Sequence, residues 1–171
     1  NGSDTAFAAP RVYITKSNSS GSIKAYFNRT VNNAVASPPS NLAIRLNNAF
    51  ADTIAAYIDR CDFTLDIAIY NFNSTGTTAI VNAINAAYQR GVIIRIVSDG
   101  NNTNTAIANL NPAIPVLNSP VNNGYFNIMH NKFMVMDAFA PDASKPVVLT
   151  GSTNWTDAQL NVDANHLVFI Q

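Results

Sequence analysis

The sequence predicts an α/β domain in which a mixed β-sheet is sandwiched between helices on both faces. Segments with the apolar pattern of strands alternate with segments whose apolar residues recur at helical spacing. The run VIIRIV at residues 92–97 is almost wholly apolar, which is typical of a strand buried on both faces. This alternation favours a layered sheet with crossover helices over an all-helical or all-β architecture.

The first part of the chain predicts short strands and one helix. Residues 1–10 form a loose leader, and strands are expected at 11–16 and 22–27 around an Asn-Ser-Ser-Gly turn. Residues 32–41, which include two adjacent prolines, are expected to form a loop. A helix is then expected from residue 40 or 41 to residue 61, because its apolar residues follow helical spacing.

The segment 64–97 predicts a βαβ unit. A strand at 64–70 is followed by a helix at 77–90, and Gly91 directly after Arg90 is a usual helix stop. The strand at 92–97 begins at once, so the two strands should lie parallel and adjacent with a right-handed crossover. The polar loop at 99–104 follows at the carboxyl end of a strand, where open α/β sheets tend to bind ligands.

The remaining elements are shorter. Strands are expected at 114–117, within 125–137, at 147–149 and at 166–170. Short helices are expected at 105–110 and, as one or two turns, at 154–160.

Composition excludes several classes of protein. The 171 residues include 12% charged residues, with ten Asp, no Glu, 25 Asn and a formal net charge of zero. This balance excludes a basic nucleic-acid arm, although a local basic pocket stays open. The single Cys61 excludes an internal disulfide and a cysteine-based zinc site. No apolar run is long enough for stable membrane insertion, and the Asn-rich polarity suggests a secreted or periplasmic, bacterial protein.

The stretch Ile128 to Asp137 carries the most informative motif. Residues two apart in a strand point the same way, so His130 and Lys132 should project together. This pair offers a nucleophile next to an anion binder. Asp137 lies at the end of the same expected strand, where it can take hydrogen bonds from the backbone or from a lysine. After the following strand, Gly151 permits a tight turn, and Ser152 and Asn154 can complete a metal-free oxyanion cradle with Lys132.

These residues resemble the phospholipase D superfamily. His130-x-Lys132-x4-Asp137 is similar to its H-x-K-x4-D signature, and Gly151-Ser152-x-Asn154 to the G-S/G-x-N segment that follows. The resemblance covers residues 42–171 as a phospholipase D-like catalytic domain, with 1–41 as a leader and short strands packed on it. It implies no metal and no cofactor. It also implies that His130 forms a phosphohistidine, while Lys132, Asn154 and a supporting Ser152 bind the phosphoryl oxygens and Asp137 belongs to the catalytic set.

The chain departs from the family pattern in two ways. The family needs two such motifs, and this chain has one, so the second should come from a homodimer partner or from a missing C-terminal half. The missing initiator Met fits a processed or excised piece. The acid that orients the nucleophilic histidine in related sequences is absent from its usual place, and Asp163 is the best replacement.

Three functions remain open at this stage. The first is a phosphodiesterase that hydrolyses or transfers phospholipid or other phosphodiester groups, a reading that zero net charge and apparent export favour. The second is a non-specific endonuclease of the same superfamily that works as a dimer, as the short one-motif form suggests. The third is a non-catalytic half-domain that binds phosphate or acts as a scaffold.

Overall fold

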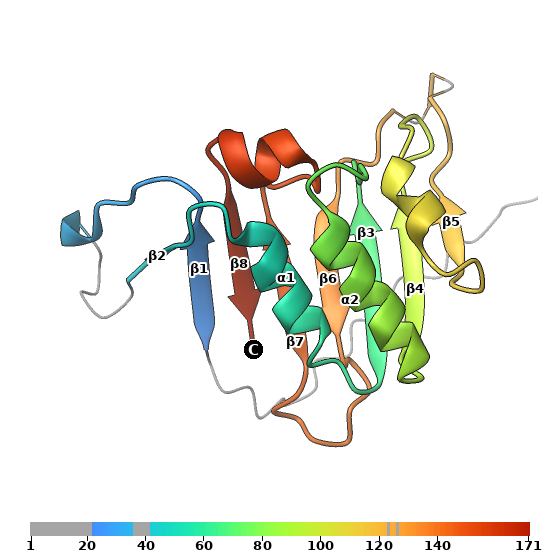
Figure 1. The fold of residues 1–171 in the computed structure, drawn as a ribbon, viewed down its shortest axis with the longest axis horizontal. Coiled ribbons are helices and arrows are strands. Elements are labelled where there is room, and N and C mark those ends of the chain that lie inside the picture. The colour runs from blue at the N-terminus through green and yellow to red at the C-terminus, as the bar shows by residue number, and fades with distance from the viewer. Residues whose placement is uncertain (1–21, 36–41, 123, 126) are drawn as a thin grey trace, which may run out of the picture.

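The computed structural model describes residues 22–35, 42–122, 124–125 and 127–171. Eight strands form one mixed sheet in the order β2-β1-β8-β7-β6-β3-β4-β5 (Figure 1). The strands are β1 (Ile23–Phe27), β2 (Ile44–Arg45), β3 (Thr64–Ile69), β4 (Ile93–Ser98), β5 (Val116–Asn118), β6 (Lys132–Met136), β7 (Val147–Gly151) and β8 (His166–Ile170). The helices are α1 (Phe50–Ile58) and α2 (Thr78–Gln89), with short turns η1 (Asn33–Val35), η2 (Thr105–Asn109) and η3 (Ala158–Val162).

The expected βαβ unit is confirmed. β3 and β4 pair in parallel, with Thr64 opposite Ile93, and α2 connects them. The predicted strand at 22–27 corresponds to β1, which joins the same sheet between β2 and β8. The predicted leader at 1–10 and the strand at 11–16 lie outside the described residues.

The first helix begins later than predicted. It starts at Phe50, whereas residues 44–45 form β2 beside β1. The Leu46 N–H donates to the Phe27 carbonyl at 2.7 Å, and Asn47 has a φ of +51°, so the backbone turns before the helix can start. Long-range pairing with β1 therefore overrides the helical spacing of the apolar residues.

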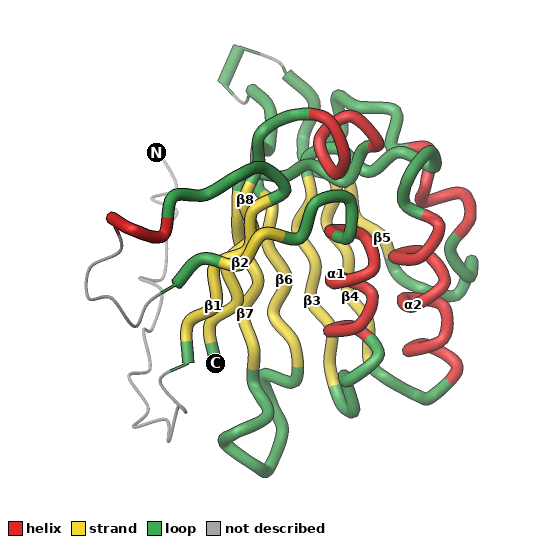
Figure 2. Tube along the Cα trace, turned by 60° about the vertical axis from the view of Figure 1, so that its left-hand side comes forward, coloured by secondary structure: helices red, strands yellow, loops and turns green. Residues whose placement is uncertain are grey.

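Both α-helices pack on the same face of the sheet (Figures 1 and 2). The buried layer between them and the sheet includes Ile54, Ile58, Ile80, Ile84, Leu65, Ile69 and Met134. The mixed sheet with helices is confirmed, but within the described ranges no α-helix covers the second face. The crossovers from β2 to β3 and from β3 to β4 run in the same direction along the sheet, and right-handed connections then place their helices on one face.

The described helices do not have the length and apolar content that crossing a bilayer requires.

Candidate active site

One edge of the sheet, the upper edge in Figure 1, gathers the polar segments that the sequence predicts to be functional. β3 and β7 end at this edge, and β6, which runs antiparallel to both, begins there. The segment that follows β3, the start of β6 at Lys132 and the loop after β7 therefore meet. A backbone bridge between Phe72 and Trp155 joins the first and the last of these segments directly.

Lys132 is the first residue of β6 and lies opposite Ile69 of β3. The residue is only 8% exposed, and its Nζ donates a hydrogen bond to the His130 carbonyl oxygen at 3.1 Å. The same Nζ lies 5.1 Å from the ring centroid of Tyr70. Burial lowers the pKa of Lys132, and no described carboxylate pairs with it. A buried cation without a counter-ion favours the binding of an anion.

His130 lies two residues before β6, so the expectation that it belongs to a strand is wrong. The Tyr70 N–H still donates to the Asn131 carbonyl at 2.8 Å, but the Met129 N–H binds the Asp99 carboxylate at 2.6 Å instead of a strand partner. The imidazole is exposed and packs against the Tyr70 ring, with 4.7 Å between centroids. None of the described residues hydrogen-bonds to this imidazole, so its ring nitrogens are open to a ligand.

Asn154 is 7% exposed and lies in the loop after β7. Gln159 fixes its backbone, because the Asn154 N–H donates to Gln159 Oε1 at 2.9 Å. The Trp155 N–H donates to the Asn71 carbonyl at 2.9 Å and ties the loop to the end of β3. The Asn154 amide has no hydrogen-bond partner among the described residues, and its Oδ1 is fully buried. The Asn154 Nδ2 group, from which no described residue accepts a hydrogen bond, can therefore donate one to a ligand.

Ser152 uses its hydroxyl within the protein. Its Oγ donates to Asn165 Oδ1 at 2.8 Å and accepts the His166 N–H at 3.1 Å. Because a hydroxyl has one proton to donate, the predicted supporting donor to substrate is already engaged. In this structure Ser152 instead joins the loop after β7 to the start of β8.

Comparison with known proteins establishes the family. Residues 54–171 match the family model described as "Cardiolipin synthase, PLD-like domain". Mitochondrial cardiolipin hydrolase of Drosophila melanogaster is 34% identical over 136 residues, which cover 70% of this chain and 51% of that protein. The chain belongs to the phospholipase D superfamily. It spans about half the length of this curated relative.

Two solved structures share the fold of this chain. Nuc from Salmonella typhimurium, a phospholipase D family member, aligns with a TM-score of 0.57 and 24% identity, covering 87% of this chain and 82% of Nuc. NucT from Helicobacter pylori aligns with the same TM-score at 20% identity, covering 87% of this chain and 86% of NucT. These likenesses confirm the predicted phospholipase D-like α/β fold.

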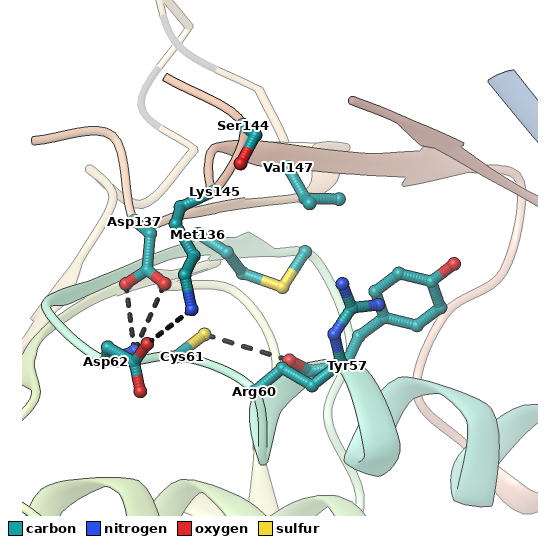
Figure 3. A pocket seen from close by; sticks show the side chains of 9 residues that line it. All are labelled: Tyr57, Arg60, Cys61, Asp62, Met136, Asp137, Ser144, Lys145 and Val147. Atoms are coloured by element: carbon teal, nitrogen blue, oxygen red, sulfur yellow. Dashed lines mark hydrogen bonds and ion pairs between the residues drawn. The ribbon is translucent and has the colours of Figure 1, made fainter. Parts of the chain in front are cut away.

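The aspartate of the phospholipase D signature lies outside this site. Asp137 follows β6, at the edge of the sheet opposite His130, and is 2% exposed. Its carboxylate accepts the backbone N–H groups of Asp62 at 3.1 Å, Phe63 at 2.7 Å and Thr64 at 3.1 Å. Figure 3 shows this carboxylate above Asp62, which pairs with Lys145. The expected backbone hydrogen bonds of Asp137 are present, and its expected place in the catalytic set is corrected to an anchoring role, because its carboxylate accepts hydrogen bonds only from backbone groups of described residues at the opposite edge of the sheet.

Asp163 is not brought into contact with His130. It is exposed, and its carboxylate makes no hydrogen bond or ion pair with any described residue. Only its backbone is engaged, because its carbonyl accepts the Asn28 amide at 2.6 Å. The phospholipase D histidine is therefore without the orienting acid that the sequence suggested.

Sequence reasoning missed Tyr70 and Gln159. Tyr70 contacts both His130 and Lys132, and Gln159 holds the Asn154 backbone. For Tyr70 a signal existed, since it ends the strand expected at 64–70, and open α/β sheets tend to bind ligands at the carboxyl ends of strands. For Gln159 there was none, because its contact depends on the fold of the η3 turn. The described residues contain no group of three His, Cys, Asp or Glu side chains that could hold a metal.

Proposed function

We propose that this chain is a metal-independent phosphodiesterase that acts through a phosphohistidine at His130. The observation that carries the proposal is the pair of side chains packed on Tyr70. One is an exposed imidazole that no described residue hydrogen-bonds, and the other is the buried Lys132 ammonium without a described counter-ion. A nucleophile next to an unpaired cation fits attack on an anionic phosphodiester.

The chemistry proceeds in two displacements at phosphorus. In the first, a ring nitrogen of His130 attacks phosphorus while the bond to the leaving oxygen breaks, and a second histidine protonates that oxygen. Lys132 Nζ and Asn154 Nδ2 bind the non-bridging oxygens. In the second, water attacks phosphorus and gives its proton to the second histidine. The phosphorus–nitrogen bond breaks, releasing a phosphomonoester and free His130.

The second histidine comes from another copy of the motif. Two chains can meet about a two-fold axis, so that each contributes His130 to one shared site. Alternatively, a second motif lies in a further part of the protein, since the chain spans about half of its curated relative. Sedimentation of the purified chain, measured together with its activity, tests these arrangements. A fully active monomer would contradict both.

Phospholipid is the proposed substrate class. No residue from 100 to 131 carries a formal charge, apart from His130 when it is protonated, and this stretch leads directly into the site. Within it Val121, Tyr125 and Ile128 are 58%, 93% and 44% exposed. An uncharged rim with exposed apolar side chains suits a lipid surface better than a polyanion, whose binding depends on phosphate contacts with Lys and Arg. The curated relative that is named a cardiolipin hydrolase supports the same class.

The test compares the wild-type chain with His130→Asn on two substrates in the presence of EDTA. Vesicles that contain cardiolipin and single-stranded DNA are supplied at equal phosphodiester concentration. We expect the wild type to release phosphatidic acid and the variant to be inactive, with a covalent adduct in intact-protein mass spectra of the wild type alone. Preferential cleavage of DNA would favour the endonuclease. Vesicle binding without turnover in either chain would favour a non-catalytic domain.

A further inference from the structure

The Asp99 carboxylate is buried directly after β4, at the same edge of the sheet as His130. It is 1% exposed. One oxygen accepts the Asn101 N–H at 2.9 Å and the Asn102 side-chain amide at 3.1 Å. The other accepts the Met129 N–H at 2.6 Å and the Ser119 hydroxyl at 3.5 Å. The carboxylate therefore joins its own loop to the segment that carries His130.

The loop at residues 99–104, which begins with Asp99, also binds the segment that follows β3. The Asn102 amide donates to the Tyr70 carbonyl at 3.2 Å, and Asn104 Oδ1 accepts the Phe72 N–H at 2.8 Å. The Asn104 amide donates back to the Asp99 carbonyl at 3.2 Å. Residues 99–104 thus bind both the backbone that presents the Tyr70 ring and the backbone next to the histidine that packs on that ring.

We propose that Asp99 is the positioning residue for the nucleophile His130, an inference that rests on the function proposed above. The His130 imidazole has no hydrogen bond from a described residue, and its segment lies outside any strand. Its placement depends on the Tyr70 ring and on the backbone at Met129. Asp163, the expected orienting acid, is exposed and does not reach it. Asp99 supplies through the backbone the constraint that an orienting acid would supply through the ring.

A carboxylate is needed at position 99 because it accepts hydrogen bonds and donates none. Its two oxygens can take several N–H groups at once, whereas Asn has one acceptor oxygen and a donor amide that would face another donor. Asp99→Asn should therefore release the Met129 N–H or the Asn101 N–H. Because a displacement of about 1 Å can lower a rate about 100-fold, we expect kcat to fall roughly 10- to 100-fold. KM should change less, since Lys132 belongs to β6 and remains in place.

The experiment compares Asp99→Asn with Asp137→Asn. Asp137 is the matched control, because it is similarly buried and also accepts backbone N–H groups, but at the opposite edge of the sheet. Both variants should lose stability, and only Asp99→Asn should lose kcat per folded molecule. An equal loss of kcat in both variants would show a general effect of destabilisation and overturn the proposal.

A second readout does not depend on activity. In the wild-type chain the Met129 amide should exchange slowly with solvent in NMR experiments, although it lies outside any strand, and the Asp99→Asn chain should exchange it at least tenfold faster. The His130 ring signals should shift in the same variant and not in Asp137→Asn. A rapidly exchanging Met129 amide in the wild type, or unchanged His130 signals in Asp99→Asn, would refute the positioning role. If the wild type shows no phosphodiesterase activity, the proposed function fails, and these signals still decide the role of Asp99.

Discussion

Replacement of Asp137 by Ala is expected to reduce stability strongly and leave the chemistry intact. The carboxylate receives the N–H groups of Asp62, Phe63 and Thr64, which lie at the start of β3. The Asp137 N–H donates in turn to the Thr64 carbonyl at 2.7 Å. The residue has a φ of +54°, a conformation that Asp tolerates better than Ala. The substitution therefore removes three acceptor contacts and adds backbone strain.

The size of the effect follows from these contacts. A buried N–H left without an acceptor costs about 1–3 kcal/mol. Asp62 and Phe63 are both exposed, so water can take over their N–H groups, and the buried Thr64 N–H accounts for about 2 kcal/mol. In a chain of this size, a loss of about 2 kcal/mol lowers the melting temperature by roughly 4–8 °C. Since typical stabilities are about 5–15 kcal/mol, the variant should remain folded at low temperature.

The assay combines thermal and urea unfolding with turnover at a temperature where every variant is folded. Asp142→Ala is the control, because Asp142 is exposed and, among the described residues, its carboxylate accepts hydrogen bonds only from nearby Ser144. We expect it to change stability by less than about 0.5 kcal/mol. An unchanged melting temperature for Asp137→Ala, or a large loss of turnover in fully folded protein, would return Asp137 to the catalytic set and refute the anchoring role.

Three further predictions concern the site itself. Burial lowers the pKa of Lys132, so the alkaline limb of the pH profile of kcat/KM should begin below the ordinary lysine pKa, and Lys132→Arg should move that limb upward. The unfolding free energy should rise with pH between the lowered pKa and the ordinary one, because the unfolded chain keeps the Lys132 proton to higher pH. His130→Ala should abolish turnover, measured on vesicles, and change stability by less than about 0.5 kcal/mol, since the imidazole is exposed. Gly100→Ala should lower kcat in the same assay, because the added methyl group would collide with the Ser119 carbonyl oxygen beside Asp99.

The centre of the fold could be predicted because its signals are local. The strands β3 and β4 are short apolar runs, and α2 has an apolar stripe at helical spacing that ends at Arg90 and Gly91. Handedness then fixes the arrangement of the three elements. By contrast, residues 44–45 were assigned to a helix, because their pairing with β1 joins strands that are separated by a long connection and leaves no local pattern.

The sequence predicted which residue types form the site, but it predicted less well how these residues are placed and which hydrogen bonds they make. Alternation along a strand placed His130 and Lys132 on one side, but β6 begins only at Lys132, and the Met129 N–H binds the Asp99 carboxylate instead of a strand partner. The number of hydrogen bonds that Asp99 would accept could not be read from its place in a polar loop. Likewise, nothing in the sequence indicated that the Ser152 hydroxyl would be used by Asn165 rather than by a ligand.

The strand β6 explains the spacing between the lysine and the aspartate of the H-x-K-x4-D signature. At about 3.3 Å per residue, the five steps from Lys132 to Asp137 span roughly 16 Å, so the two ends of the motif cannot share one ligand. They share one strand register instead: Asp137 binds the start of β3, and Lys132 lies opposite Ile69 at its end. A slip of one residue would turn Lys132 to the other face of the sheet. Asp137 therefore stabilises one end of this pairing, while the backbone ladders of β6 with β3 and β7 hold the ammonium group at the substrate edge.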